Sequence, residues 1–89
     1  MSSIKLFKKE INNTIGAFIE EVYFWELDHP EADPKKTDSL VDKAISLFDD
    51  LIDKIHQAKR AGGASGFKPL REQLDKTLND LQEELNKLG

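Results

Sequence analysis

The first third of the chain carries apolar residues at the spacing of one helical face. They follow one another at intervals of three or four residues: Ile4, Phe7, Ile11, Ile15, Phe18, Val22 and Trp25. Such intervals keep side chains on one stripe of an α-helix, whereas a half-buried strand needs strict alternation. The pattern predicts a helix over residues 3–28. It ends before Pro30, because the residue that precedes a proline is driven out of the α region.

Two further segments have the same period. In residues 39–61 the apolar positions span an arc of about 160°, wide enough to face two neighbouring helices. They are Leu40, Val41, Ala44, Ile45, Leu47, Phe48, Leu51, Ile52, Ile55 and Ala58. Residues 69–88 carry a narrower seam that consists of Leu70, Leu74, Leu78, Leu81, Leu85 and Leu88. Candidate N-caps at Thr37, Asp38 and Ser39 precede the second helix, and Gly62–Gly63 follows it.

Three helices of similar length joined by short linkers favour antiparallel neighbours. We therefore expect an all-α fold, an up-down-up antiparallel three-helix bundle that forms a single domain over residues 1–89. The linker 28–38 has too few apolar residues to be buried, so it should lie on the surface.

Composition removes several classes of function. The 89 residues include no cysteine, which excludes disulfides, thiolate metal sites and thiol catalysis. No apolar run approaches the roughly 20 residues that cross a bilayer, so we expect no membrane association. The basic N-terminus is interrupted by polar residues and does not resemble a signal peptide, so a cytoplasmic location is expected.

In the expected bundle, basic and acidic residues gather at opposite ends. Residues 54–71 carry five basic residues and no acidic one, whereas residues 14–53 carry eleven acidic and three basic residues. The start of the third helix, framed by Lys59, Arg60, Lys68 and Arg71, is a candidate anion site beside the Gly62–Gly66 loop. No P-loop pattern is present, and the pI of about 5.1 disfavours nucleic acid.

Three consecutive aromatic residues, Tyr23, Phe24 and Trp25, cannot all face one helical stripe. With Trp25 inside, Phe24 points away from the core. Either the 28–38 linker folds over it, or the ring lies exposed, or Tyr23, Phe24 and Leu27 form a contact surface for another chain. The leucine seam of residues 69–88 is a second surface through which the chain could associate with itself.

Motifs for catalysis or metal binding are weak. Asp49-Asp50-x-x-Asp53 matches a magnesium-binding string of terpenoid synthases, but 89 residues cannot enclose their cavity. Asp53 and His56 have the spacing of a di-iron ligand pair without the further inward carboxylates such sites need. The acidic linker around His29 lacks the spacing of an EF-hand. We expect no catalytic residue, no metal, no cofactor and no enzymatic activity.

Residues 11–27 (INNTIGAFIEEVYFWEL) and 48–52 (FDDLI) resemble a family of short, uncharacterised bacterial helical proteins. The resemblance implies a helical fold and no activity. The function expected is therefore a non-catalytic protein–protein interaction or accessory module, with an unknown protein partner or as a homodimer. The alternative is binding of an anion or nucleic acid at the basic end.

Overall fold

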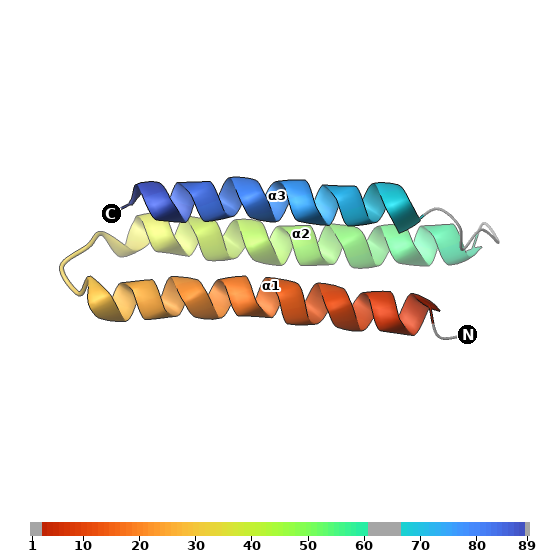
Figure 1. Cartoon of the computed structure of the whole chain (residues 1–89), viewed down its shortest axis with the longest axis horizontal. Coiled ribbons are helices and arrows are strands. Elements are labelled where there is room, and N and C mark those ends of the chain that lie inside the picture. Colours follow the sequence, from red (N-terminus) through yellow and green to blue (C-terminus); the bar gives the residue numbers. More distant parts are fainter. Residues whose placement is uncertain (1–2, 61–66, 89) are drawn as a thin grey trace.

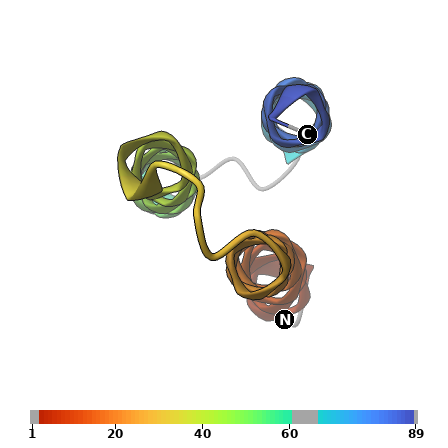
Figure 2. The same ribbon diagram turned by 90° about the vertical axis from the view of Figure 1, so that its left-hand side faces the viewer.

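The chain folds into three long helices that lie side by side, seen in a computed structural model that describes residues 3–60 and 67–88 (Figure 1). They are α1 (Ser3–Asp28), α2 (Pro34–Arg60) and α3 (Phe67–Lys87). Successive helices run in opposite directions, and the end-on view places them at the corners of a triangle (Figure 2). The predicted all-α, up-down-up three-helix bundle is confirmed.

One hydrophobic cluster runs along the axis of the bundle. Its buried members are Phe7, Ile11, Ile15, Phe18, Val22, Leu40, Ala44, Leu47, Leu51, Ile55, Leu70, Leu74, Leu81 and Leu85. Every one of them belongs to a predicted apolar stripe. Four of the six leucines of the α3 seam are buried in this core, and the other two, Leu78 and Leu88, pack against it. The seam is therefore not available as a surface for self-association.

The start of α2 differs from the sequence prediction. The helix begins at Pro34, five residues before the expected residue 39. The Lys35 backbone N–H donates to Asp33 Oδ1 at 3.0 Å, so Asp33 is the N-cap. Proline fits the first helical position because its missing N–H needs no partner there. The predicted caps at Thr37–Ser39 lie within the helix.

The burial of Thr37 also differs from the sequence prediction. We expected it on a surface linker, yet its side chain is only 1% exposed. Its hydroxyl lies within hydrogen-bond distance of the Glu26 carboxylate and is 3.1 Å from the Pro34 carbonyl oxygen. The contact ties the last turn of α1 to the first turn of α2.

Polar contacts between helices fix how they align. Lys43 Nζ of α2 lies 3.0 Å from Glu84 Oε1 of α3, and Gln82 Nε2 of α3 donates to Glu21 Oε2 of α1 at 2.8 Å. α3 starts at Phe67, two residues earlier than expected, and Pro69 falls in its first turn. The Gly62–Gly63 stop lies outside the described residues. Across 3–60 and 67–88, no helix has the length and apolar character needed to cross a membrane.

Candidate functional site

The outer surface of α1 exposes large apolar side chains. Phe24 is 64% exposed, Leu27 75% and Tyr23 52%, and Leu6 is 63% exposed near the other end of the helix. The linker does not cover Phe24, so that sequence alternative is wrong. Scattered single apolar residues are normal on a surface, whereas neighbouring ones point to contact with another molecule. We call Tyr23, Phe24 and Leu27 the Phe24 patch.

A hollow borders this patch between the C-terminal turns of α1 and the last turns of α3. It has a volume of ≈ 370 Å³ and is lined by Glu21, Phe24, Trp25, Asp28, His29, Leu85 and Asn86. Its walls combine the rings of Phe24, Trp25 and His29 and a leucine with two carboxylates and the Asn86 amide. Such a lining suits a partner side chain with an apolar stem and a positive charge.

The acidic residues near the patch oppose the dipole of their own helix. Glu20, Glu21, Glu26 and Asp28 lie in the last turns of α1, and the final turn has no basic residue. A helix C-terminus carries partial negative charge, so the two carboxylates of the last turn, Glu26 and Asp28, are each unfavourable by about 0.3–1 kcal/mol at low salt. Glu21 and Glu26 accept hydrogen bonds from Gln82 and Thr37 of the neighbouring helices, whereas Glu20 and Asp28 are exposed.

The turn between α1 and α2 is held by aromatic and polar contacts that the sequence pattern did not single out. The His29 ring stacks on Trp25, and Thr37 contacts Glu26. A hollow of ≈ 260 Å³ beside them is lined by Trp25, Glu26, His29, Pro30, Ala32, Asp33, Pro34 and Thr37. Within the described residues, no buried side-chain nitrogen or oxygen lacks a hydrogen-bond partner. The cluster therefore presents no orphaned polar atom for a ligand.

The antiparallel topology gathers the predicted anion-binding residues at one end of the bundle. Lys59 and Arg60 end α2 and Lys68 lies in the first turn of α3, at the end where α1 begins (Figure 1). Arg71, however, pairs with Glu10 and lies over the Phe7 ring, 4.8 Å from its centroid. The Gly62–Gly66 loop lies outside the described residues. One of the four predicted cations is thus already engaged within the bundle.

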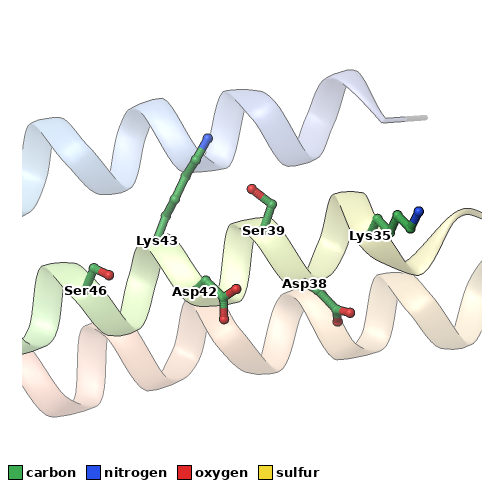
Figure 3. A pocket seen from close by; sticks show the side chains of 6 residues that line it. All are labelled: Lys35, Asp38, Ser39, Asp42, Lys43 and Ser46. Atoms are coloured by element: carbon green, nitrogen blue, oxygen red, sulfur yellow. The ribbon is translucent and has the colours of Figure 1, made fainter.

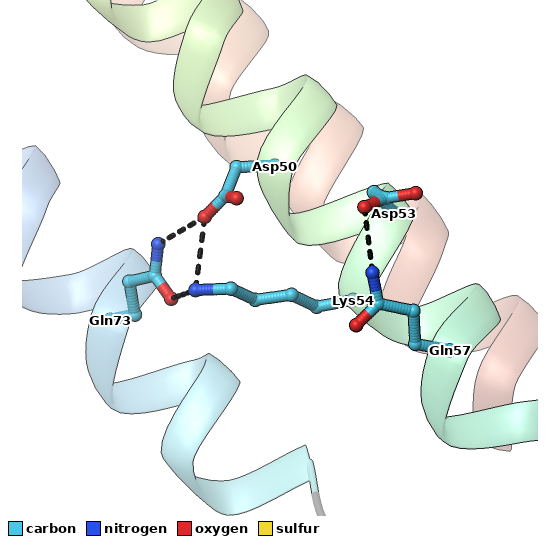
Figure 4. A network of polar contacts seen from close by, with 5 residues as sticks. All are labelled: Asp50, Asp53, Lys54, Gln57 and Gln73. Atoms are coloured by element: carbon cyan, nitrogen blue, oxygen red, sulfur yellow. Dashed lines mark hydrogen bonds and ion pairs between the residues drawn. The ribbon is translucent and has the colours of Figure 1, made fainter. Parts of the chain in front are cut away.

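Two aspartates of the Asp49-Asp50-x-x-Asp53 string, Asp50 and Asp53, make polar contacts within α2 and to α3 (Figure 4). Asp50 Oδ2 accepts from Gln73 Nε2 at 2.8 Å and lies 3.1 Å from Lys54 Nζ, whereas Asp53 accepts from Gln57 Nε2 at 2.9 Å. The hydrogen bond from Gln73, followed by that from Lys54, lowers the pKa of Asp50. In the part of the chain that the structure describes, no three histidine, aspartate or glutamate residues are grouped to hold a metal ion.

A shallow hollow of ≈ 480 Å³ lies on the outer face of α2 (Figure 3). Its lining residues are Lys35, Asp38, Ser39, Asp42, Lys43 and Ser46. All six are exposed polar residues of one helix. A hollow lined by a single helix does not surround a substrate, so it offers no catalytic pocket.

Comparison of the chain with protein families, curated proteins and solved structures gave no match. The resemblance to short bacterial helical proteins stays a prediction. Of the predicted site residues, the structure brings Tyr23, Phe24 and Leu27 together on α1, beside an acidic hollow. These residues form the best-defined candidate binding surface.

Proposed function

We propose that the protein is a non-catalytic interaction module that binds a basic, amphipathic segment of a protein partner through the Phe24 patch. The observation that carries the proposal is the coincidence of exposed aromatic and aliphatic side chains with surplus carboxylates on the last turns of α1. Aromatic residues are enriched at the centres of protein interfaces. Carboxylates around them select a positively charged partner and speed its approach.

The hollow beside Phe24 supports the same chemistry. Trp25 and Phe24 offer ring surfaces, and Glu21 and Asp28 offer carboxylates, around a space of ≈ 370 Å³. A lysine or arginine side chain can lay its stem on the rings while its charge meets the carboxylates. An amphipathic helix from the partner would add the apolar residues that cover Phe24 and Leu27.

A matched pair of variants tests this proposal. Leu6 and Phe24 lie 18 residues apart, five helical turns, so they share one face of α1 about 27 Å apart. Their exposed fractions are nearly equal, 63% and 64%. Exposed carboxylates of Glu20, Glu21 and Asp28 flank Phe24, whereas Leu6 is flanked by Lys5 and Lys9, and the nearby Glu10 pairs with Arg71. Phe24→Lys should therefore weaken binding, and Leu6→Lys should leave it unchanged.

The probe is a synthetic helical peptide of leucine and lysine, with a leucine–glutamate peptide as its counterpart. Trp25, the single tryptophan, lines the hollow, so its fluorescence reports occupancy. We expect the leucine–lysine peptide to bind the wild-type protein and Leu6→Lys, and Phe24→Lys to weaken binding at least about tenfold. Equal binding of both peptides, or equal binding by both variants, contradicts the proposal. The same variants, used as baits in cell extract, then identify the partner.

A further inference from the structure

A second apolar surface lies on the other side of α1, where it meets α2. Four apolar residues of α2 repeat there at intervals of four, three and four: Val41, Ile45, Phe48 and Ile52. This is the spacing of a helix-packing seam. α2 thus has a buried seam inside the bundle and a second seam that is only half-covered. Ile45, at its centre, is 47% exposed.

The middle of this surface is hollowed. A space of ≈ 200 Å³ is lined by Asn12, Ile15, Gly16, Ile19, Ile45 and Phe48. An apolar cavity of about 150 Å³ is large enough to hold a benzene molecule. The hollow therefore accommodates the end of one large aliphatic or aromatic side chain. We call it the Gly16 hollow.

Gly16 keeps this space open. A Cβ atom built on Gly16 meets nothing within 4 Å, so the packing of the bundle does not require glycine there. Glycine in a helix interior is unfavourable relative to alanine. The glycine is explained if another molecule approaches α1 closely at this point, because the absence of a Cβ lets a side chain of that molecule reach the helix backbone.

The charges on either side of the Gly16 hollow have opposite net signs. Toward the N-terminus of α1 lie Lys5 and Lys9, and at the same end Lys59 of α2 is accompanied by Asp49 and Asp53. Toward the other end lie Glu20 of α1 and Asp38 and Asp42 of α2. All of these side chains are exposed. The surface is therefore apolar at its centre, weakly positive at one end and negative at the other.

Such a surface is complementary to itself in one orientation. A two-fold axis through the Gly16 hollow, perpendicular to the helices, places the positive end of one copy against the negative end of the other. A parallel arrangement would place lysines against lysines and carboxylates against carboxylates. We infer that two copies of this chain pack antiparallel through the α1–α2 surface, with the Gly16 hollow of one copy facing that of the other so that the two α1 helices approach closely. Closed two-fold dimers are the commonest assembly of soluble proteins.

This interface adjoins the Phe24 patch and shares its edge residue Leu27, but the two surfaces have different centres, Gly16 in one case and Phe24 in the other. Phe24 faces the α3 side of α1, where it lines a hollow with Leu85. The Gly16 hollow is lined by residues of α1 and α2 alone. A protein that stays monomeric would overturn the dimer and leave the Phe24 patch untouched, and loss of peptide binding in Phe24→Lys would not bear on the dimer.

The first test is the oligomeric state of the wild-type chain and two glutamine variants. Gly16→Gln fills the hollow without an internal clash and favours the helix, so folding stability should be kept or raised while association is lost. Ala17→Gln, an exposed position on the other side of α1, is the control. In sedimentation equilibrium from about 1 to 500 µM, wild type and Ala17→Gln should dimerise, and Gly16→Gln should raise the dissociation constant at least about tenfold. A monomer throughout this range, or a dimer insensitive to Gly16→Gln, overturns the inference.

Orientation is tested by disulfide cross-linking, which a chain without cysteine makes clean. Lys5 and Leu27 are exposed and lie eleven residues on either side of Gly16. In the antiparallel dimer, Lys5→Cys of one copy faces Leu27→Cys of the other, whereas two identical cysteines lie about 33 Å apart along the helix axis. A mixture of the two variants should form the mixed disulfide faster than either variant alone forms its own. Preferential formation of the like pairs overturns the antiparallel arrangement.

Discussion

The imidazole of His29 stacks on the indole of Trp25, with ring centroids 4.0 Å apart and planes 12° from parallel. His29 Nδ1 lies 2.9 Å from the Trp25 carbonyl oxygen and therefore acts as the donor of that hydrogen bond. One residue of the linker thus caps the end of α1 through both its ring face and its ring nitrogen. The stack covers Trp25 at the point where the chain turns toward α2.

Removal of this ring should uncover Trp25. We expect His29→Ala to shift the tryptophan emission to longer wavelength and to lower the free energy of unfolding by about 1 kcal/mol, as for other aromatic pairs. The chain has one tryptophan, so both effects can be read by fluorescence during urea unfolding. His29→Phe keeps a stacked ring and should keep the emission maximum. An unchanged emission maximum in His29→Ala would contradict a stabilising role for the stack.

Thr37 and Glu26 should be coupled energetically. Thr37→Val keeps the shape of a side chain that is only 1% exposed and removes its hydroxyl, which leaves the half-buried Glu26 carboxylate without its partner. We expect a loss of about 1–2 kcal/mol in the free energy of unfolding. In the Thr37→Val background, Glu26→Gln should cost clearly less than in the wild type. Additive effects in this double-mutant cycle would show that the contact contributes nothing.

Asp33 should determine where α2 begins. Asp33→Ala removes the acceptor of the Lys35 backbone N–H and should lower the stability by about 1 kcal/mol, whereas Asp33→Asn keeps an acceptor and should have a smaller effect. Ser39→Ala provides the comparison, because Ser39 lies inside the helix and should change stability little. A larger loss from Ser39→Ala than from Asp33→Ala would restore the boundary that the sequence predicted.

Local periodicity was enough to predict the three helices and their core. The stripe from Phe7 to Val22 follows from apolar spacing alone, and burial confirms it. The start of α2 was missed because two N-terminal signals compete in the sequence. Both Asp33-Pro34 and Thr37-Asp38-Ser39 have residues typical of a helix N-terminus. The residues between them are polar, so no apolar spacing indicates that the helix begins at the earlier position.

The candidate sites were predictable only in part. The helical wheel placed Phe24 opposite the core, and its exposure agrees. The pairing of Arg71 with Glu10 joins residues 61 positions apart, so only the assembled bundle reveals that this cation is engaged. The Gly16 hollow was missed for a similar reason. From the sequence, a glycine within a helix indicates only a small loss of helix stability. The open space beside Gly16 depends on Ile45 and Phe48 of the neighbouring helix, which the sequence alone does not place there.

The carboxyl of Asp50 should respond to a side chain on the neighbouring helix. The hydrogen bond from Gln73, followed by that from Lys54, holds the pKa of Asp50 below its ordinary value of 3.8. Gln73→Leu removes the larger cause, so the pKa of Asp50 should rise toward that value. Gln57→Leu is the matched control, because Gln57 donates to Asp53 instead. The titration is measured from the carboxyl carbon by NMR.

The same shift fixes the pH dependence of the α2–α3 contact. A carboxyl whose pKa is lower in the folded chain stabilises the fold above the unfolded pKa, and this contribution disappears as the pH falls through the lowered, folded value. The wild-type protein should therefore lose more stability than Gln73→Leu between pH 4 and pH 2, a window of about two units that begins near the ordinary aspartate pKa and extends below it. Because Asp50 is exposed, the difference should be small and should shrink in salt. Equal acid sensitivity of the two proteins at low salt, with an unchanged Asp50 titration, would show that Gln73 does not hold this carboxylate.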